Sequence, residues 1–140
     1  MVCRLNDIYR RIAKKIKRRY RRPQWSGPVT FNEFVRYVLD PDAQLQQPPD
    51  RHWRPFYQLC QPCQRHYDFI GHYETLEADA AYVLRKLGLQ KTISTENRGR
   101  HRNSSNFMVP YFAKVPPKRI ERLYQHFRVD FDLFGYRWPL

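Results

Sequence analysis

The chain has 140 residues, a length that suits one modest domain or part of a larger one. Hydrophobic residues make up 41% of it and aromatic residues 16%, which excludes a disordered tail. Lys and Arg number 26 against 13 Asp and Glu, and the net charge of +13 favours polyanionic partners such as nucleic acid, anionic lipid or sulfated polysaccharide. No stretch approaches the roughly 20 apolar residues of a membrane span, and the N-terminus lacks the apolar core of a signal peptide.

A basic amphipathic helix is predicted from Arg4 to Arg22. Its apolar residues recur every three or four positions, and lysines and arginines fill the other faces. Pro23 and Gly27 end the pattern. The charge suits DNA, RNA or an acidic membrane, yet no helix-turn-helix or aromatic RNA-binding motif accompanies it. A solvated helix face is therefore the simpler interpretation.

Thr30 and Glu33 form a capping-box pattern and predict a second helix that ends near Asp40-Pro41. The segment Asp42–Pro49 is polar and proline-rich, which predicts an exposed loop. Between Trp53 and Cys63 the periodicity is mixed, and the local structure stays open.

Aromatic and β-branched residues over Tyr67–Gly71 predict a short strand, and Thr75 is expected to cap the helix that follows. Gly88 supplies the stop signal of that helix.

The polar stretch Gln90–Asn106 shows no periodicity and predicts a loop. Pro116-Pro117 opens a last pair of helices that ends at Gly135.

The pair Cys60-Gln61-Pro62-Cys63 admits several chemistries. With His52 or His66 it offers thiolate and imidazole ligands for zinc, but a second pair of cysteines or spaced histidines is missing. Thiol oxidoreductases carry such a pair on a thioredoxin-like fold, which the flanking pattern does not indicate. A structural disulfide or plain buried cysteines are favoured, and no metal site is predicted.

Three further features are candidate site residues. His52-Trp53 either lines a sugar-binding cleft or is a core tryptophan beside a hydrogen-bonded histidine. Arg98, Arg100 and Arg102 either bind a phosphate or sulfate or are merely solvated. Asn103-Ser104-Ser105 fits the N-glycosylation pattern, which matters only in a lumenal protein.

A series of motifs in order resembles the Golgi carbohydrate sulfotransferases of the group that contains the chondroitin and dermatan 4-sulfotransferases and the HNK-1 sulfotransferase. The motifs are Val29-Thr30-Phe31-Asn32-Glu33-Phe34-Val35, His52-Trp53, Leu59-Cys60-x-Pro62-Cys63, Tyr67-Asp68-x-Ile70-Gly71-x-x-Glu74-Thr75-Leu76-x-x-Asp79, Tyr111-Phe112, Leu123-Tyr124 and Asp130-Phe131-x-Leu133-Phe134-Gly135-Tyr136.

The resemblance implies an α/β fold of the P-loop-like sulfotransferase kind, of which residues 1–140 represent the mostly helical C-terminal portion with few short strands. It implies transfer of a sulfonyl group from 3'-phosphoadenylyl sulfate (PAPS) to a hydroxyl of a glycan such as chondroitin, dermatan or an N- or O-linked chain, in the Golgi lumen. The implied partners are a glycan and no nucleic acid. The resemblance also favours a structural disulfide of Cys60 and Cys63, nucleotide or acceptor contacts from Arg98, Arg100 and Arg102, and acceptor contacts from His52 and Trp53.

The chain departs from this family in two respects. Neither nucleotide-binding motif of the family is found between Met1 and Thr30, so the nucleotide-binding N-terminal part and the membrane anchor are expected to lie outside this chain, and the chain alone is expected to be inactive. Arg51 stands where related sequences commonly carry an acid before His-Trp. The alternative function is a basic RNA- or heparin-binding module without catalysis.

Overall fold

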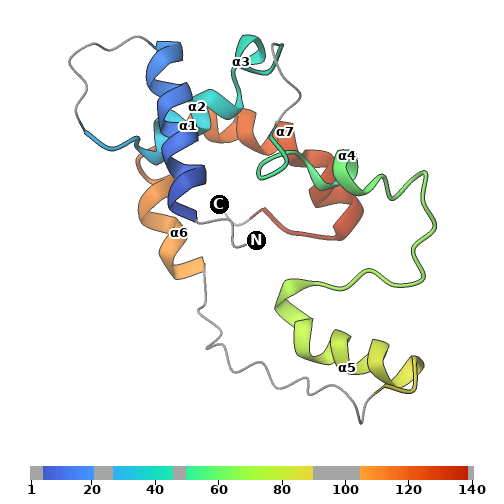
Figure 1. Cartoon of the computed structure of the whole chain (residues 1–140). Coiled ribbons are helices and arrows are strands. Elements are labelled where there is room, and N and C mark those ends of the chain that lie inside the picture. Colours follow the sequence, from blue (N-terminus) through green and yellow to red (C-terminus); the bar gives the residue numbers. More distant parts are fainter. Residues whose placement is uncertain (1–4, 21–26, 46–49, 90–104, 139–140) are drawn as a thin grey trace. The chain divides into compact units, whose positions relative to one another are not determined.

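The computed structural model describes residues 5–20, 27–45, 50–89 and 105–138 (Figure 1). The chain divides into two compact units, one formed by residues 1–60 with 104–140 and the other by residues 61–103. Every regular element of the described residues is a helix, and none of those helices is both long and apolar enough to cross a membrane. The described part of the chain is therefore helical.

The first unit begins with α1 (Leu5–Tyr20), which confirms the predicted basic helix. Ile16 is fully buried on its inner side. At the end of α1, the Arg19 guanidinium donates to the Asp40 carboxylate at 3.0 Å and to the Asp42 carboxylate at 2.9 Å, and the Tyr20 hydroxyl donates to Asp40 at 3.1 Å. These contacts join the end of α1 to the segment that follows the second helix.

The helix α2 (Phe31–Val38) starts with the predicted capping box. The Glu33 N–H donates to the Thr30 hydroxyl at 3.3 Å, and the Thr30 N–H donates to the Glu33 carboxylate at 3.0 Å. Both side chains therefore satisfy backbone groups that the first turn of a helix leaves unpaired. The sequence signal and the structure agree at this position.

A short helix, α3 (Pro41–Leu45), replaces the first part of the loop predicted at Asp42–Pro49, so that prediction is wrong for this part. The Asp40 carboxylate accepts the N–H groups of Asp42 and Ala43 at 3.1 and 3.4 Å. Aspartate before proline is a helix start signal as well as a stop signal, because proline needs no partner for its nitrogen at the first helical position. Residues 46–49 lie outside the described part.

Three more helices complete the first unit: α4 (Phe56–Cys60), α6 (Ser105–Phe112) and α7 (Pro117–Phe134). The predicted pair of C-terminal helices is wrong, because α7 continues without interruption to Gly135, which ends it in the left-handed conformation at φ +67°. The apolar positions that had suggested two helices lie along one.

The core of this unit lies where α2 contacts α1, α6 and α7. Its buried cluster consists of Val35, Val38, Val115 and Leu123, and aromatic side chains surround it. The Phe31 ring meets the Phe112 ring edge-on at 5.0 Å between centroids, which fixes α6 against α2. The ring of Trp138 packs against Tyr124 and Phe131 beside α7.

The second unit contains η1 (Tyr73–Thr75) and α5 (Leu76–Lys86), which Gly88 ends at φ +68° as predicted. Thr75 stands at the start of α5, but its hydroxyl caps no backbone group and donates instead to the Asp79 carboxylate at 2.6 Å. Asp79 also accepts the His72 N–H at 2.9 Å. These two hydrogen bonds, that of Thr75 first, lower the pKa of Asp79.

The strand predicted at Tyr67–Gly71 is wrong, since this segment has no regular structure. A strand needs a partner for its backbone hydrogen bonds, and the described residues contain no strand to pair with. The Phe69 ring lies against the Tyr82 ring of α5 at 5.3 Å, so its apolar character serves packing against a helix. Most of the predicted loop Gln90–Asn106 lies outside the described residues, and its last two residues begin α6.

Candidate functional site

His52 forms a close pair with Asp50 in the turn that follows α3. The Asp50 carboxylate lies 2.6 Å from His52 Nδ1 and also accepts the His52 N–H at 3.1 Å. The backbone N–H groups of Trp53 and Arg54 both donate to the Asp50 carbonyl at 3.1 Å, which closes the turn. The two side chains keep 38% and 34% of their surface exposed, so a ligand can reach the imidazole.

The charge state of Asp50 sets the roles in this pair. Partial burial tends to raise the pKa of Asp50, but hydrogen bonds from the side chain and backbone of His52, with the positive charge of Lys15, lower it overall. Asp50 is thus a carboxylate near neutral pH and accepts from Nδ1–H. The lone pair of a neutral His52 then lies on Nε2, the arrangement of a general base.

Trp53 anchors this turn to the core. Its ring meets the Phe34 ring edge-on at 5.6 Å and the Tyr37 ring at 6.2 Å, both on α2. The indole nitrogen is buried and has no hydrogen-bond partner among the described residues. Of the two roles that the sequence allowed, the structure shows that of a core tryptophan beside a hydrogen-bonded histidine.

The far side of the turn is held by Asp130, a buried acid on α7. Its carboxylate accepts the backbone N–H groups of Phe56 and Tyr57 at 2.6 and 2.8 Å, the first two amides of α4. Asp130 is thus a helix cap supplied from a distant part of the chain. Together with Trp53, it fixes the position of the Asp50–His52 pair.

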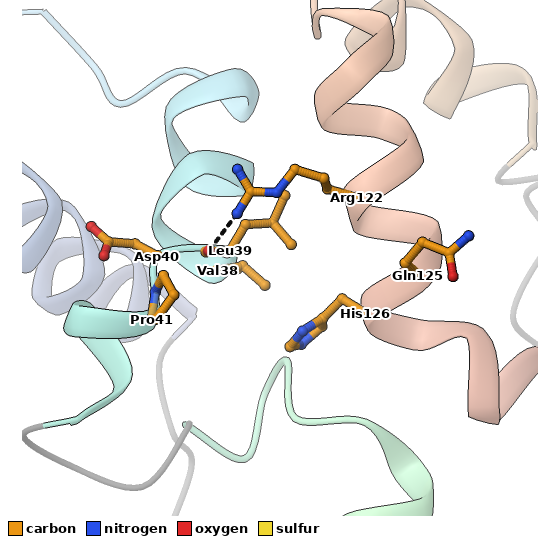
Figure 2. A pocket seen from close by; sticks show the side chains of 7 residues that line it. All are labelled: Val38, Leu39, Asp40, Pro41, Arg122, Gln125 and His126. Carbon is orange, nitrogen blue, oxygen red and sulfur yellow. Dashed lines mark hydrogen bonds between the residues drawn. The ribbon is translucent and has the colours of Figure 1, made fainter.

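A pocket of about 490 Å³ lies nearby, between the end of α2 and α7 (Figure 2). Its lining residues are Val38, Leu39, Asp40, Pro41, Arg122, Gln125 and His126. Figure 2 shows Arg122 reaching from α7 to the Leu39 carbonyl, to which it donates at 3.3 Å, while Asp40 and Gln125 point away from each other.

His126 brings an imidazole to this pocket. Partial burial lowers the pKa of His126, and the negative charge of Asp130 opposes this shift. The pocket thus offers a cation, a neutral imidazole and an apolar wall, which suits a polar ligand with one flat apolar face. It shares no lining residue with the Asp50–His52 pair.

The structure describes some of the other predicted site residues and not others. Arg98, Arg100, Arg102 and the glycosylation candidate Asn103 lie outside the described residues. Cys60 and Cys63 are both exposed thiols in the structure, and their disulfide stays a prediction. Among the described residues, no group of three or more His, Cys, Asp or Glu side chains is arranged to hold a metal ion.

The sequence interpretation had missed Asp50 and Asp130. Asp50 had a local signal, since an aspartate two residues before a histidine can accept both its backbone and ring N–H groups. Asp50 directly precedes Arg51, whose side chain is exposed. Asp130 had no such signal, because its partners lie 73 and 74 positions earlier.

A model of the sulfotransferase family matches residues 2–137, which is nearly the whole chain. The chain belongs to the sulfotransferase family. It is 38% identical to carbohydrate sulfotransferase 12 of Xenopus laevis over 95% of this chain and 34% of that protein. It is 41% identical to carbohydrate sulfotransferase 10 of Xenopus laevis over 91% of this chain and 38% of that protein, and 34% identical to carbohydrate sulfotransferase 11 of Rattus norvegicus over 95% and 40%.

The family membership confirms the resemblance drawn from the ordered motifs. The chain spans about a third to two-fifths of the length of these relatives. No solved structure matches the chain.

Proposed function

We propose that the chain forms the acceptor side of a carbohydrate sulfotransferase, which transfers a sulfonyl group from PAPS to a hydroxyl of a glycan. The observation that carries the proposal is the Asp50–His52 pair, an exposed imidazole oriented by a carboxylate at 2.6 Å in a chain of this family. The names of the relatives support a sugar acceptor.

In the proposed reaction, His52 is the general base. The acceptor oxygen forms a bond to sulfur while the bond from sulfur to the donor phosphate breaks, and the electron pair leaves with the phosphate. The hydroxyl proton moves to His52 Nε2, and the Asp50 carboxylate stabilises the imidazolium that results. Trp53 holds the turn in place through its packing on α2, so its role is to position His52.

The donor PAPS is a substrate in this scheme. Arg98, Arg100 and Arg102 are proposed to contact its phosphates or anionic groups of the acceptor, since guanidinium groups bind such oxygens through paired hydrogen bonds. The P-loop-like fold is proposed for the complete domain, with its nucleotide-binding part supplied by residues outside this chain. The 140-residue chain alone is expected to give no measurable transfer.

The same proposal predicts the cellular compartment of the protein. Members named as carbohydrate sulfotransferases are expected in the Golgi, on the lumenal side of the membrane. There an oxidised Cys60–Cys63 pair would restrain the turn after α4, and Asn103 would be available for glycosylation.

A chimera tests this function. Residues 2–137 replace the aligned segment of Xenopus laevis carbohydrate sulfotransferase 12, and transfer of radiolabelled sulfate from PAPS to unsulfated chondroitin is measured. We expect transfer by the chimera, and a loss of about 100-fold or more with His52→Gln, the usual range for a general base.

The matched control is Gln58→Ala, an exposed residue of α4 that should leave transfer unchanged. A folded chimera that binds a donor analogue but sulfates neither chondroitin nor dermatan nor a glycoprotein glycan would refute the proposal. Turnover that survives His52→Gln would refute the role of His52.

A further inference from the structure

The helix α5 and its C-cap residue carry an apolar stripe that is not part of a core. We call its five residues, Leu76, Ala80, Val83, Leu84 and Leu87, the α5 apolar stripe. With 3.6 residues per turn they fall within an arc of about 100° on the helix. Leu76 and Leu87 keep 40% and 63% of their surface exposed, and no residue of α5 is buried. An amphipathic helix normally packs such a stripe against another element.

The segment that precedes α5 contacts a different side of this helix. The Phe69 ring lies against the Tyr82 ring at 5.3 Å, and the Asp79 carboxylate accepts the Thr75 hydroxyl and the His72 N–H. On the helix, Asp79 and Tyr82 both lie outside the arc of the stripe. These contacts therefore lie beside the α5 apolar stripe and do not cover it.

The exposed apolar surface of the second unit extends beyond the stripe. Ile70, Tyr73 and Leu89 are large apolar side chains of this unit, and all three are exposed. Among the residues of this unit that the structure describes, 61–89, none is buried. A unit of this size without a core cannot offset the entropy that it loses on folding. Its order therefore requires an apolar partner, and contiguous exposed apolar surface is typical of such an interface.

The comparison with the relatives indicates which partner this is. The aligned segment takes up 34% of Xenopus laevis carbohydrate sulfotransferase 12 and 38% of carbohydrate sulfotransferase 10, so more than half of each relative lies outside it. The family model, which matches residues 2–137, runs through both units of this chain. The second unit thus belongs to a domain whose larger part is available to cover the stripe.

A second copy of this chain is a poorer partner for the stripe. A stable interface between separate proteins uses about 20–30 residues on each side, far more than the five of the α5 apolar stripe. Contacts within one domain need fewer residues, because the covalent link has already brought the two surfaces together. The size of the stripe therefore favours a partner in the same polypeptide.

We propose that the α5 apolar stripe packs against an apolar surface of the part of the sulfotransferase domain that lies outside this chain. The inference rests on the proposed function, which assigns that part to the complete domain as its nucleotide-binding portion. The second unit then obtains its core from residues that this chain does not contain. The stripe is an internal contact of the complete domain and an exposed surface of the 140-residue chain.

Hydroxyl-radical footprinting tests this by comparing the 140-residue chain with the chimera that contains residues 2–137. Mass spectrometry reads the oxidation of Leu76 and Leu87. We expect fast oxidation in the chain and about tenfold or more slower oxidation in the chimera, because closely packed side chains exclude water. Equal oxidation in both proteins would overturn the proposal.

Slow oxidation in the 140-residue chain would overturn it as well. Sedimentation velocity then identifies the true partner: a dimer would mean that a second copy covers the stripe, and a monomer would mean that another part of this chain does. If the first chimera is insoluble, a second chimera that receives only residues 61–103 gives the same comparison. Circular dichroism checks that each protein is folded.

A pair of variants in the chimera measures what the contact contributes. The test variant is Leu76→Ser with Leu87→Ser, and the control is Ala78→Ser with Arg85→Ser, two exposed positions on the opposite side of α5. The test variant should lower the thermal midpoint by about 5 °C or more, because it removes two side chains from a packed contact. The control should lower it by at most about 2 °C, through helix propensity.

Equal shifts in the two variants would contradict the proposal, whereas a test variant that fails to fold beside a folded control would support it. Neither measurement depends on turnover. A chimera that protects the stripe but transfers no sulfate would count against the proposed function alone. A chimera that transfers sulfate while Leu76 and Leu87 stay as reactive as in the isolated chain would overturn this inference alone.

Discussion

The Asp130 carboxylate accepts the backbone N–H of Phe56 at 2.6 Å, although 74 positions separate the two residues. This bond and the one from Tyr57 join the last long helix to the start of α4. Asp130 thereby fixes one end of the segment whose other end carries the Asp50–His52 pair. The position of a candidate catalytic group thus depends on a helix cap supplied by a distant part of the chain.

Asp130→Ala should therefore destabilise the first unit. The change leaves two amides of α4 without their acceptor and removes a charge-assisted interaction, which should cost about 2–3 kcal/mol of unfolding free energy. Urea unfolding followed by tryptophan fluorescence measures the loss. Asp132→Ala is the control, since its pair with Arg128 is exposed at 3.5 Å and should contribute less than about 1 kcal/mol. Similar losses in the two variants would contradict the capping role.

Asp50→Asn should impair the chimera described above while leaving its fold intact. An amide no longer fixes the His52 tautomer or stabilises its protonated form, so kcat should fall by about 100-fold or more with little change in the KM for PAPS. Steady-state kinetics on unsulfated chondroitin, with its pH profile, measure both constants. A rise in the donor KM at constant kcat would show that Asp50 acts in donor binding and does not orient the base.

The Tyr20 hydroxyl should lose its proton at a higher pH than an ordinary tyrosine. Burial, followed by the hydrogen bond to Asp40, raises its pKa from 10.0 to about 12. A raised folded-state pKa gives a contribution to stability that is complete below pH 10 and is lost as the pH rises through 12. Phenolate absorbance should contain a component near pH 12 that Tyr20→Phe removes and that Tyr9→Phe, a change at an exposed tyrosine of the same helix, does not. Loss of that component in both variants would argue against the Asp40 contact.

Gly135→Ala should cost about 1–2 kcal/mol of unfolding free energy, since an L-residue is strained in the left-handed region. The φ angle of Gly135 is +67°, and a Cβ atom would meet no other atom within 4 Å. The cost therefore comes from the backbone alone, and Gly135→Asn should recover part of it because asparagine tolerates this conformation. Chemical denaturation compares the three proteins, and an unchanged stability of the alanine variant would mean that α7 ends differently in solution.

Features with local causes could be predicted from the sequence. The α1 helix follows from its periodicity, the start of α2 from Thr30 and Glu33, and the end of α5 from Gly88. In each case the residues that decide the structure lie within about two helical turns of one another.

Features that depend on residues far apart in the sequence could not be predicted from it. The cap of α4 is Asp130, and α6 contains Pro110, a residue that argues against a helix in any local interpretation. The residues of Tyr67–Gly71 are of types that favour strands, but here their aromatic character serves the packing of Phe69 on Tyr82. The sequence predicted the candidate site in part. His52 stands in one of the motifs, whereas the role of Asp50 becomes clear only from the turn that brings the two side chains together.

The hydrogen bond from Phe56 to Asp130 also affects the order in which parts of the fold form during synthesis. The ribosome adds Asp130 74 residues after Phe56, so α4 can acquire its cap only after Asp130 has left the ribosome. Until then the turn that carries His52 has Trp53 as its anchor to α2 and nothing on its other side from α7. The nascent protein thus completes its candidate catalytic turn only after this part of α7 has been made, and a chain truncated before Asp130 would never complete it.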